Sequence, residues 1–132
     1  MVNKIKKWLS KGDEDAQMHL PESEKATFIL SVDNIQVGTL HCERGIWEFK
    51  YTDEFKRHAD EYTTIVGFPD IEKIYRSNTL WPFFRIRIPG LKQSFIQEVI
   101  QMEHIDKDNE VALLKRFGNK TIANPYELQL SY

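Results

Sequence analysis

The sequence predicts an α+β fold, in which a small antiparallel β-meander packs against several short helices. Two observations carry this prediction. Apolar and polar residues alternate between residues 26 and 51, which is typical of half-buried strands. After residue 90 the apolar residues recur every three or four positions instead, which is typical of amphipathic helices.

The composition indicates one globular domain with almost balanced charge. The chain has 132 residues, of which 41% are hydrophobic, and this is enough for a single core. A net charge of −2 provides no basic field for a phosphate backbone, so we expect no direct binding of nucleic acid. No apolar run is long enough to cross a bilayer. The single cysteine, Cys42, suits a reducing compartment, and we expect a cytoplasmic protein.

The first 25 residues differ in character from the rest, and we expect a domain over residues 26–132. A basic patch is followed by an acidic one, with few apolar residues, which is typical of a mobile extension. An alternative remains open. Ile5, Trp8 and Leu9 have the spacing of a short helix that docks on the body of the protein or on a partner.

Three strands are expected between residues 26 and 51. Asp33-Asn34 and Glu43-Arg44-Gly45 are residues that tolerate a positive φ, and they separate the apolar runs as hairpin turns. Gly38 indicates a bulge or a close approach of the backbone. Trp47, Phe49 and Tyr51 fall on one face of the third strand.

The next segment is less regular. Thr52, followed by two acidic residues, predicts the start of a short helix to about Ala59. Tyr62 to Phe68 is rich in β-branched and aromatic residues, which favours a fourth strand. Ile71 to Tyr75 is interpreted as a single helical turn.

Residues 80–90 (LWPFFRIRIPG) admit two interpretations. Strict alternation favours a half-buried strand, whereas Pro82 in a first turn and Pro89 at the end favour a short helix. In both cases the stretch cannot bury every large group it carries. We therefore expect some of its large side chains to reach the surface, where aromatic residues and arginines are enriched at protein interfaces. The candidates are Trp81, Phe83, Arg85 and Arg87.

Helices are expected in the C-terminal part. Leu91, Phe95, Val99 and Met102, with Ile96 and Ile100 adjacent to them, predict an amphipathic helix that ends near His104. A second helix is capped by Asp106 or Asp108, carries an apolar stripe of Val111, Leu113, Leu114 and Phe117, and ends at Gly118. Asn124-Pro125-Tyr126-Glu127 has the form of a third helix start, five residues before the last residue. This pattern favours a fold that continues further or completes its packing on another chain.

The residues that usually carry catalysis are not arranged for it. On a strand, His41 and Cys42 point to opposite faces, which is a poor arrangement for a nucleophile and its base. The four histidines have no metal-ligand spacing, and no glycine-rich phosphate loop is present. We therefore expect a protein that is not an enzyme and that needs no cofactor or metal.

Taken together, five short motifs resemble the N-terminal domain of HipA-type serine/threonine kinases. They occur in the expected order at residues 37–40 (VGTL), 47–51 (WEFKY), 83–84 (FF, with Pro89), 114–118 (LKRFG) and 124–128 (NPYEL). In that family the phenylalanine-rich segment is a helix, so the resemblance favours a helix over residues 80–88. The phosphate-binding loop and the catalytic and metal-binding aspartates of the family lie in a large region downstream of this domain.

The resemblance implies a HipS-like antitoxin from a split HipA system. Such a protein binds a HipA-like (HipT-like) kinase toxin in trans and holds it inactive, beside a HipB-like DNA-binding partner. Trp81 and Phe83 would then be aromatic anchors, and Arg85 and Arg87 would pair with carboxylates of the kinase. The alternative is an interaction or regulatory domain that completes or activates a partner kinase.

Overall fold

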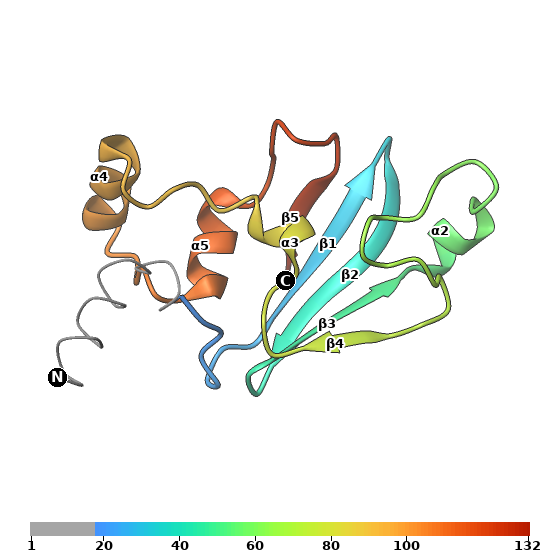
Figure 1. Ribbon diagram of the computed structural model, residues 1–132, viewed down its shortest axis with the longest axis horizontal. Helices are drawn as coiled ribbons and strands as arrows, with labels where there is room; N and C mark the ends of the chain where they lie inside the picture. Colours follow the sequence, from blue (N-terminus) through green and yellow to red (C-terminus); the bar gives the residue numbers. More distant parts are fainter. Residues whose placement is uncertain (1–17) are drawn as a thin grey trace, which may run out of the picture.

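A computed structural model describes residues 18–132 of the protein (Figure 1). These residues form one five-stranded sheet, in the order β4-β3-β2-β1-β5 with every neighbouring pair antiparallel, and four short helices. The strands are β1 (Ala26–Val32), β2 (Ile35–Glu43), β3 (Ile46–Tyr51), β4 (Tyr75–Ser77) and β5 (Glu127–Ser131). The helices are α2 (Asp53–Arg57), α3 (Pro82–Arg85), α4 (Ser94–Met102) and α5 (Glu110–Phe117). The predicted α+β class is therefore confirmed.

The predicted meander of β1, β2 and β3 is confirmed. Asp33, Asn34, Arg44 and Gly45 all have positive φ, as tight hairpin turns between twisted strands require. The pairing of β1 with β2 shifts by one residue beside Gly38. A Cβ atom at this glycine would lie 2.5 Å from the Phe49 ring, so the sheet has both the irregularity and the close approach that the glycine indicates.

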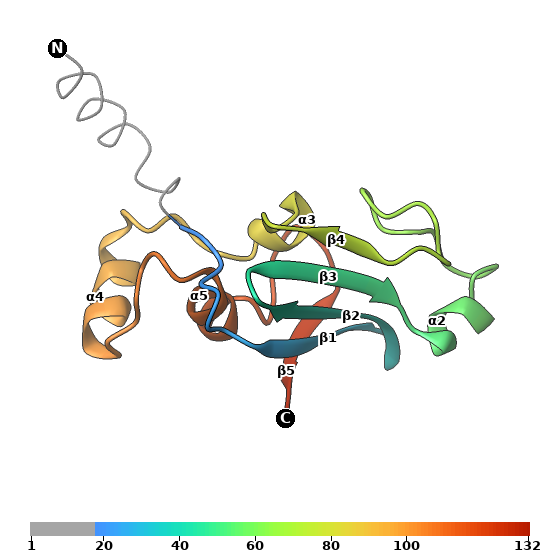
Figure 2. The same ribbon diagram turned by 90° about the horizontal axis from the view of Figure 1, so that it is seen from below.

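One face of the sheet is buried. Phe28, Leu40, Trp47 and Phe49 alternate inward from three adjacent strands and are almost inaccessible to solvent. They form a single core with α3, α5 and the connecting loops. The other face carries mostly polar residues, as expected for an antiparallel sheet with one solvated side. Figures 1 and 2 show α4 at one end of the molecule and α2 at the other.

Two predictions between residues 52 and 79 are wrong, although the cap of α2 is correct. The Thr52 side chain accepts a hydrogen bond from Phe55 N (3.0 Å), as predicted. Residues 62–68 form no strand, because Tyr51 holds the segment as a loop: its hydroxyl accepts from Ile65 N (2.9 Å) and donates to Phe68 O (2.6 Å). Residues 71–74 form no helix, and the fourth strand is Tyr75–Ser77, which begins at the last residue of the predicted helical turn.

The two predicted C-terminal helices exist, with different details. The N-cap of α5 is Asn109, not Asp106 or Asp108, and its side chain accepts from the amides of Val111 and Ala112. The predicted stripe of α5 is confirmed: Val111, Leu113 and Leu114 are buried and Phe117 is packed against the core. On α4 the predicted apolar face is confirmed in part, since Leu91 and Ile100 pack against the core. Ile96 is the buried residue, whereas Phe95 and Met102 are 69% and 80% exposed.

The expected third helix is wrong as well. Asn124 lies in a turn, and Glu127–Ser131 forms β5, an edge strand paired with β1. Leu128 of this strand is buried. The residues after Pro125 therefore complete the sheet of the domain itself, which removes the argument for packing on another chain.

Residues 1–17 of the expected N-terminal extension (residues 1–25), with the alternative helix of Ile5, Trp8 and Leu9, fall outside the described residues. Within them, Met18 and Leu20 are buried in the core, and His19 pairs with the backbone before α5. None of the helices in residues 18–132 is both long and apolar enough to cross a membrane.

Candidate partner-binding surface

Within the stretch from residue 80 to 90, Pro82–Arg85 form the short helix α3, so the helical interpretation is the correct one. Pro82 occupies the first turn, where its missing N–H is not needed. Helical hydrogen bonds continue to Ile88, whose amide bonds to Arg85 O (3.0 Å), and Pro89 then ends the segment. The candidate surface is therefore built on a short helix with a defined start and end.

The aromatic side chains of this stretch divide between core and surface. Phe84 is fully buried, with its ring 5.5 Å from that of Phe49. Trp81 and Phe83 are half-buried, and each packs edge-on against a neighbour: Trp81 on Phe68 (5.2 Å) and Phe83 on Tyr126 (5.6 Å). Trp81 and Phe83 therefore offer rigid, partly accessible aromatic surface.

Arg85 links α3 to a buried carboxylate. Its Nη1 lies 3.4 Å from Glu110 Oε2, and the Arg85 side chain is 35% exposed. Glu110 is only 3% exposed, and its other oxygen accepts a hydrogen bond from Trp47 Nε1 (3.1 Å). Burial raises the pKa of Glu110, while the hydrogen bond from Trp47 and the charge of Arg85 oppose that shift.

Arg87 lies inside the domain, with 3% of its surface exposed. Its guanidinium donates to four oxygens of the segment that follows α5: Gly118 O (3.0 Å), Asn119 O (3.2 Å), Asn124 Oδ1 (3.1 Å) and Tyr126 O (2.7 Å). Burial lowers the pKa of Arg87 to about 10, so the group stays charged at neutral pH. Arg87 therefore shapes the domain from within, and a contact with a partner carboxylate would require it to leave these bonds.

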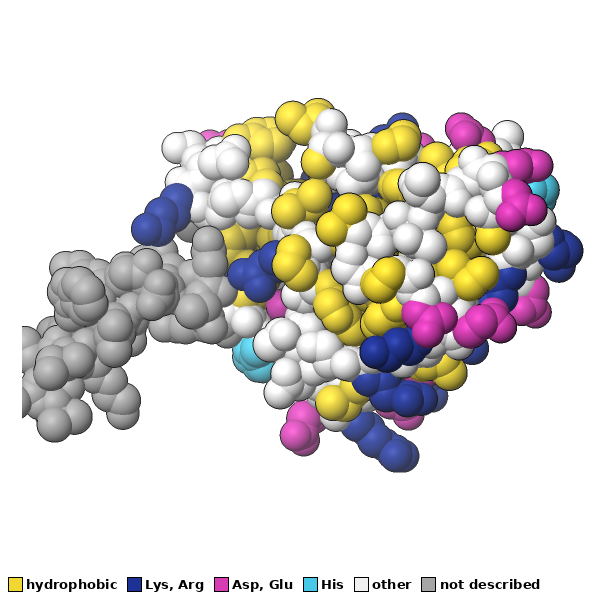
Figure 3. Space-filling view, turned by 45° about the vertical axis from the view of Figure 1, so that its right-hand side comes forward, with side chains coloured by type: hydrophobic (Ala, Val, Ile, Leu, Met, Phe, Trp, Pro, Cys, Tyr) yellow, Lys and Arg dark blue, Asp and Glu magenta, His cyan; other side chains and the backbone are white. Residues whose placement is uncertain are grey.

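Sequence reasoning missed two exposed apolar residues. Ile86, the C-cap residue of α3, is 51% exposed. Ile122 is fully exposed in the loop that Arg87 holds, two residues before the predicted helix start at Asn124. The turn-forming residues at 118–120 and 124–125 were the signal for this loop. In the view of Figure 3, hydrophobic side chains form a broken band across the described surface, with charged side chains gathered at its edge.

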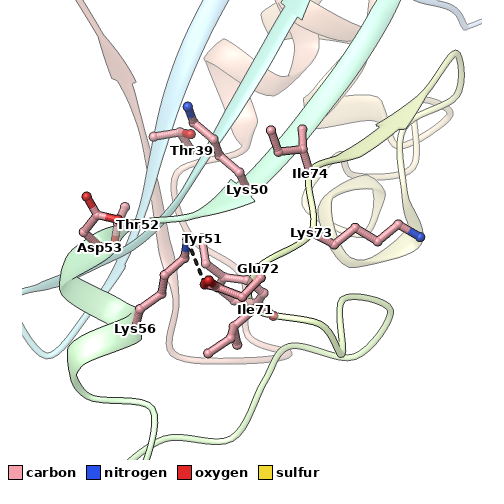
Figure 4. Close-up of a pocket in the computed structure, with 10 residues that line it drawn as sticks. All are labelled: Thr39, Lys50, Tyr51, Thr52, Asp53, Lys56, Ile71, Glu72, Lys73 and Ile74. Atoms are coloured by element: carbon pink, nitrogen blue, oxygen red, sulfur yellow. Dashed lines mark ion pairs between the residues drawn. The ribbon is translucent and has the colours of Figure 1, made fainter.

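A polar cleft lies at the other end of the sheet. It encloses about 330 Å³ between β3, α2 and the loop before β4, and an ion pair between Lys56 and Glu72 (3.1 Å) crosses it (Figure 4). None of the four predicted contact residues lines it. Lys73 points away from it in Figure 4.

The groups considered for catalysis occupy different environments. Cys42 is fully buried in the core, and burial raises the pKa of its thiol to about 11. His41 points to the open face, with Thr27 Oγ1 2.7 Å from its Nδ1 and Glu43 Oε1 3.2 Å from its Nε2. The predicted separation of His41 from Cys42 is therefore confirmed. Within residues 18–132, no three His, Cys, Asp or Glu side chains are placed to share a metal ion.

Comparison with known proteins gives the family. The model of the HipA N-terminal domain matches residues 29–123, which is most of the chain and includes β2, β3, β4 and helices α2 to α5. No curated protein matches the chain. The chain belongs to the HipA N-terminal domain family.

Proposed function

We propose that this protein is a non-catalytic antitoxin, which binds a HipA-like serine/threonine kinase toxin in trans and inhibits it. The observation that carries this proposal is the family match over residues 29–123. A HipB-like DNA-binding protein is the expected third component, and a cytoplasmic location follows from the kinase. The buried Cys42 thiol, protonated at neutral pH, is consistent with a role in binding rather than in catalysis.

The proposed contact surface is the outer side of α3. Trp81 and Phe83 are held by edge-on ring contacts, so they would lose little conformational freedom on binding. Arg85 stands beside them with about a third of its side chain exposed, and Ile86 adds apolar area. Rigid aromatic groups next to an arginine are the composition of binding hot spots.

The first test is co-purification of this protein with a HipA-like kinase that lacks its own N-terminal domain, followed by an autophosphorylation assay of that kinase. A stable complex with suppressed autophosphorylation would support the antitoxin proposal. A complex with raised activity would support the alternative, a regulatory domain that completes or activates the kinase. Failure to form a complex would contradict both.

The second test replaces the proposed anchor. Trp81→Ala should weaken kinase binding by at least about 2 kcal/mol while the protein remains folded, because Trp81 is only half-buried. Titration calorimetry gives the affinity, and urea unfolding gives the stability. Phe84→Ala is the matched control for a core residue, and we expect it to destabilise the fold by about 3–5 kcal/mol. If Trp81→Ala unfolds like Phe84→Ala, Trp81 is a core residue and not an anchor.

A further inference from the structure

Helix α4 carries apolar residues on two sides. Ile96 is buried and Ile100 is packed against the core, so these two residues attach the helix to the body. At 3.6 residues per turn, Phe95, Val99 and Met102 lie within about 60° of one another and about 60–120° from Ile96. We call these three residues the outer stripe of α4.

The outer stripe is uncovered within the described part of the chain. Phe95 is 69% exposed and Met102 is 80% exposed, whereas Val99 between them is half-buried. Single exposed apolar side chains are common on protein surfaces. Two large ones on one stripe of a nine-residue helix indicate a surface that another segment covers.

The N-terminal part of the chain joins the fold beside this helix. His19 N donates to Asp108 O (2.8 Å) and Glu110 N donates to His19 O (2.9 Å). These bonds fix the chain to the connection between α4 and α5. The chain therefore enters the described fold at the end of the molecule that α4 occupies in Figures 1 and 2.

The sequence of residues 1–17 matches the outer stripe. Ile5, Trp8 and Leu9 share one side of a helical turn and would supply an apolar face of similar length. Lys4, Lys6 and Lys7 flank them. Glu98 lies between Phe95 and Met102 in the helix, is exposed, and forms no ion pair within residues 18–132.

The connecting segment is also long enough. The chain from Leu9 to Met18 spans up to about 30 Å when extended, and α4 is only about 14 Å long. We propose that residues 5–9 dock in cis on the outer stripe of α4, with Ile5, Trp8 and Leu9 against Phe95, Val99 and Met102 and the lysines near Glu98. This inference does not depend on the proposed kinase partner.

Limited trypsin digestion of the full chain tests the proposal, because trypsin cleaves after Lys6 and Lys7. A docked segment is cleaved only when it opens, so the double variant F95S/M102S should be cleaved at these sites at least about tenfold faster than the wild type. Val66→Ser is the matched control, since Val66 is 89% exposed in the loop that follows α2, and it should leave the rate unchanged. Equal cleavage of wild type and F95S/M102S would overturn the proposal.

Two further measurements separate docking in cis from contact between two copies of the chain. Wild-type cleavage should not depend on protein concentration, and slower cleavage at higher concentration would mean that a second copy covers the stripe, which overturns docking in cis. Trp8→Ser changes no residue within 18–132 and should accelerate deuterium exchange of the α4 amides. Unchanged exchange in α4 would also overturn the proposal.

Discussion

Arg87 holds a surface loop in place from inside the domain, through four hydrogen bonds that reach 31 to 39 residues along the chain. A lysine keeps the charge but lacks the planar fork that reaches these oxygens. We expect Arg87→Lys to lower the free energy of unfolding by about 2 kcal/mol. It should also accelerate deuterium exchange in residues 119–126.

The matched control for this prediction is Arg76→Lys. Arg76 is 63% exposed and pairs with Glu48 at 3.1 Å across the sheet. Exposed pairs contribute little, so this variant should stay within about 0.5 kcal/mol of the wild type. If urea unfolding shows the same loss of unfolding free energy for both substitutions, the Arg87 guanidinium does not hold the loop of residues 119–126.

Glu110 gives the fold a specific dependence on pH. Its pKa is raised above the ordinary 4.5 by burial, so the folded protein binds a proton more tightly than the unfolded chain does. The contribution of Glu110 to stability is therefore largest below pH 4.5 and is lost as pH rises through the folded-state pKa. A glutamine side chain does not titrate, so the stability of wild type relative to Glu110→Gln should decrease from acidic to neutral pH. Urea unfolding of both proteins across this range measures it, and a constant difference would contradict the prediction.

The environments of the four predicted contact residues depend on partners that are distant in the sequence. The sequence could therefore not show which of the four are buried. Trp81 and Phe83 reach the surface in part, as their crowding predicted. Arg85 and Arg87 differ because their partners, Glu110 and the oxygens after α5, are 25 to 39 residues away. No local pattern contains that information.

At the scale of elements, β2 depends on Gly38. A Cβ at this position would lie 2.5 Å from two carbons of the Phe49 ring, and Phe49 is fully buried and has little room to move. Overpacking of this kind typically costs about 1–3 kcal/mol, and we expect Gly38→Ala to fall at the upper end. Gly90→Ala is the control, because its Cβ would meet only the flexible Gln93 side chain at 3.3 Å. If the urea midpoints of Gly38→Ala and Gly90→Ala shift equally, the Phe49 ring moves to accommodate the added Cβ.

Elements defined by local signals were predicted well, and those defined by pairing were not. The meander, the cap at Thr52 and helix α5 follow from neighbouring residues. Strand β5 pairs with β1 about 100 residues away. The local sequence Asn124-Pro125 has the form of a helix start and contains no sign of that pairing. The loop over 62–68 has the composition of a strand, but the Tyr51 hydroxyl bonds its backbone and takes the place of a sheet partner. The outer stripe of α4 satisfies helical periodicity while facing solvent, and periodicity alone does not identify which side packs.

At the scale of the whole molecule, the proposed contact surface and the polar cleft belong to different parts of the sheet. Helix α3 packs on the buried face through Phe84, next to the loop that Arg87 holds. The cleft lies toward the end that α2 occupies (Figure 1), and its lining includes Thr39 and Lys50 on the solvated face of the sheet and the exposed Ile74. An added charge at the α3 surface or at the cleft therefore tests which of the two surfaces contacts the proposed kinase partner.

Three matched substitutions make this test. Ile86→Asp and Ile122→Asp place a charge on exposed apolar positions of α3 and of the loop after α5, and a partner that buries them must desolvate that charge. We expect each to weaken kinase binding at least tenfold, about 1.4 kcal/mol. Ile74→Asp makes the same change beside the cleft, where Ile74 is 44% exposed, and should stay within about twofold, or 0.4 kcal/mol. Because all three side chains are exposed, the free energy of unfolding in urea should be nearly unchanged. A loss of affinity would then mean that the substituted residue lies in the interface. A loss for Ile74→Asp alone would place the proposed kinase partner at the cleft and contradict a contact at α3.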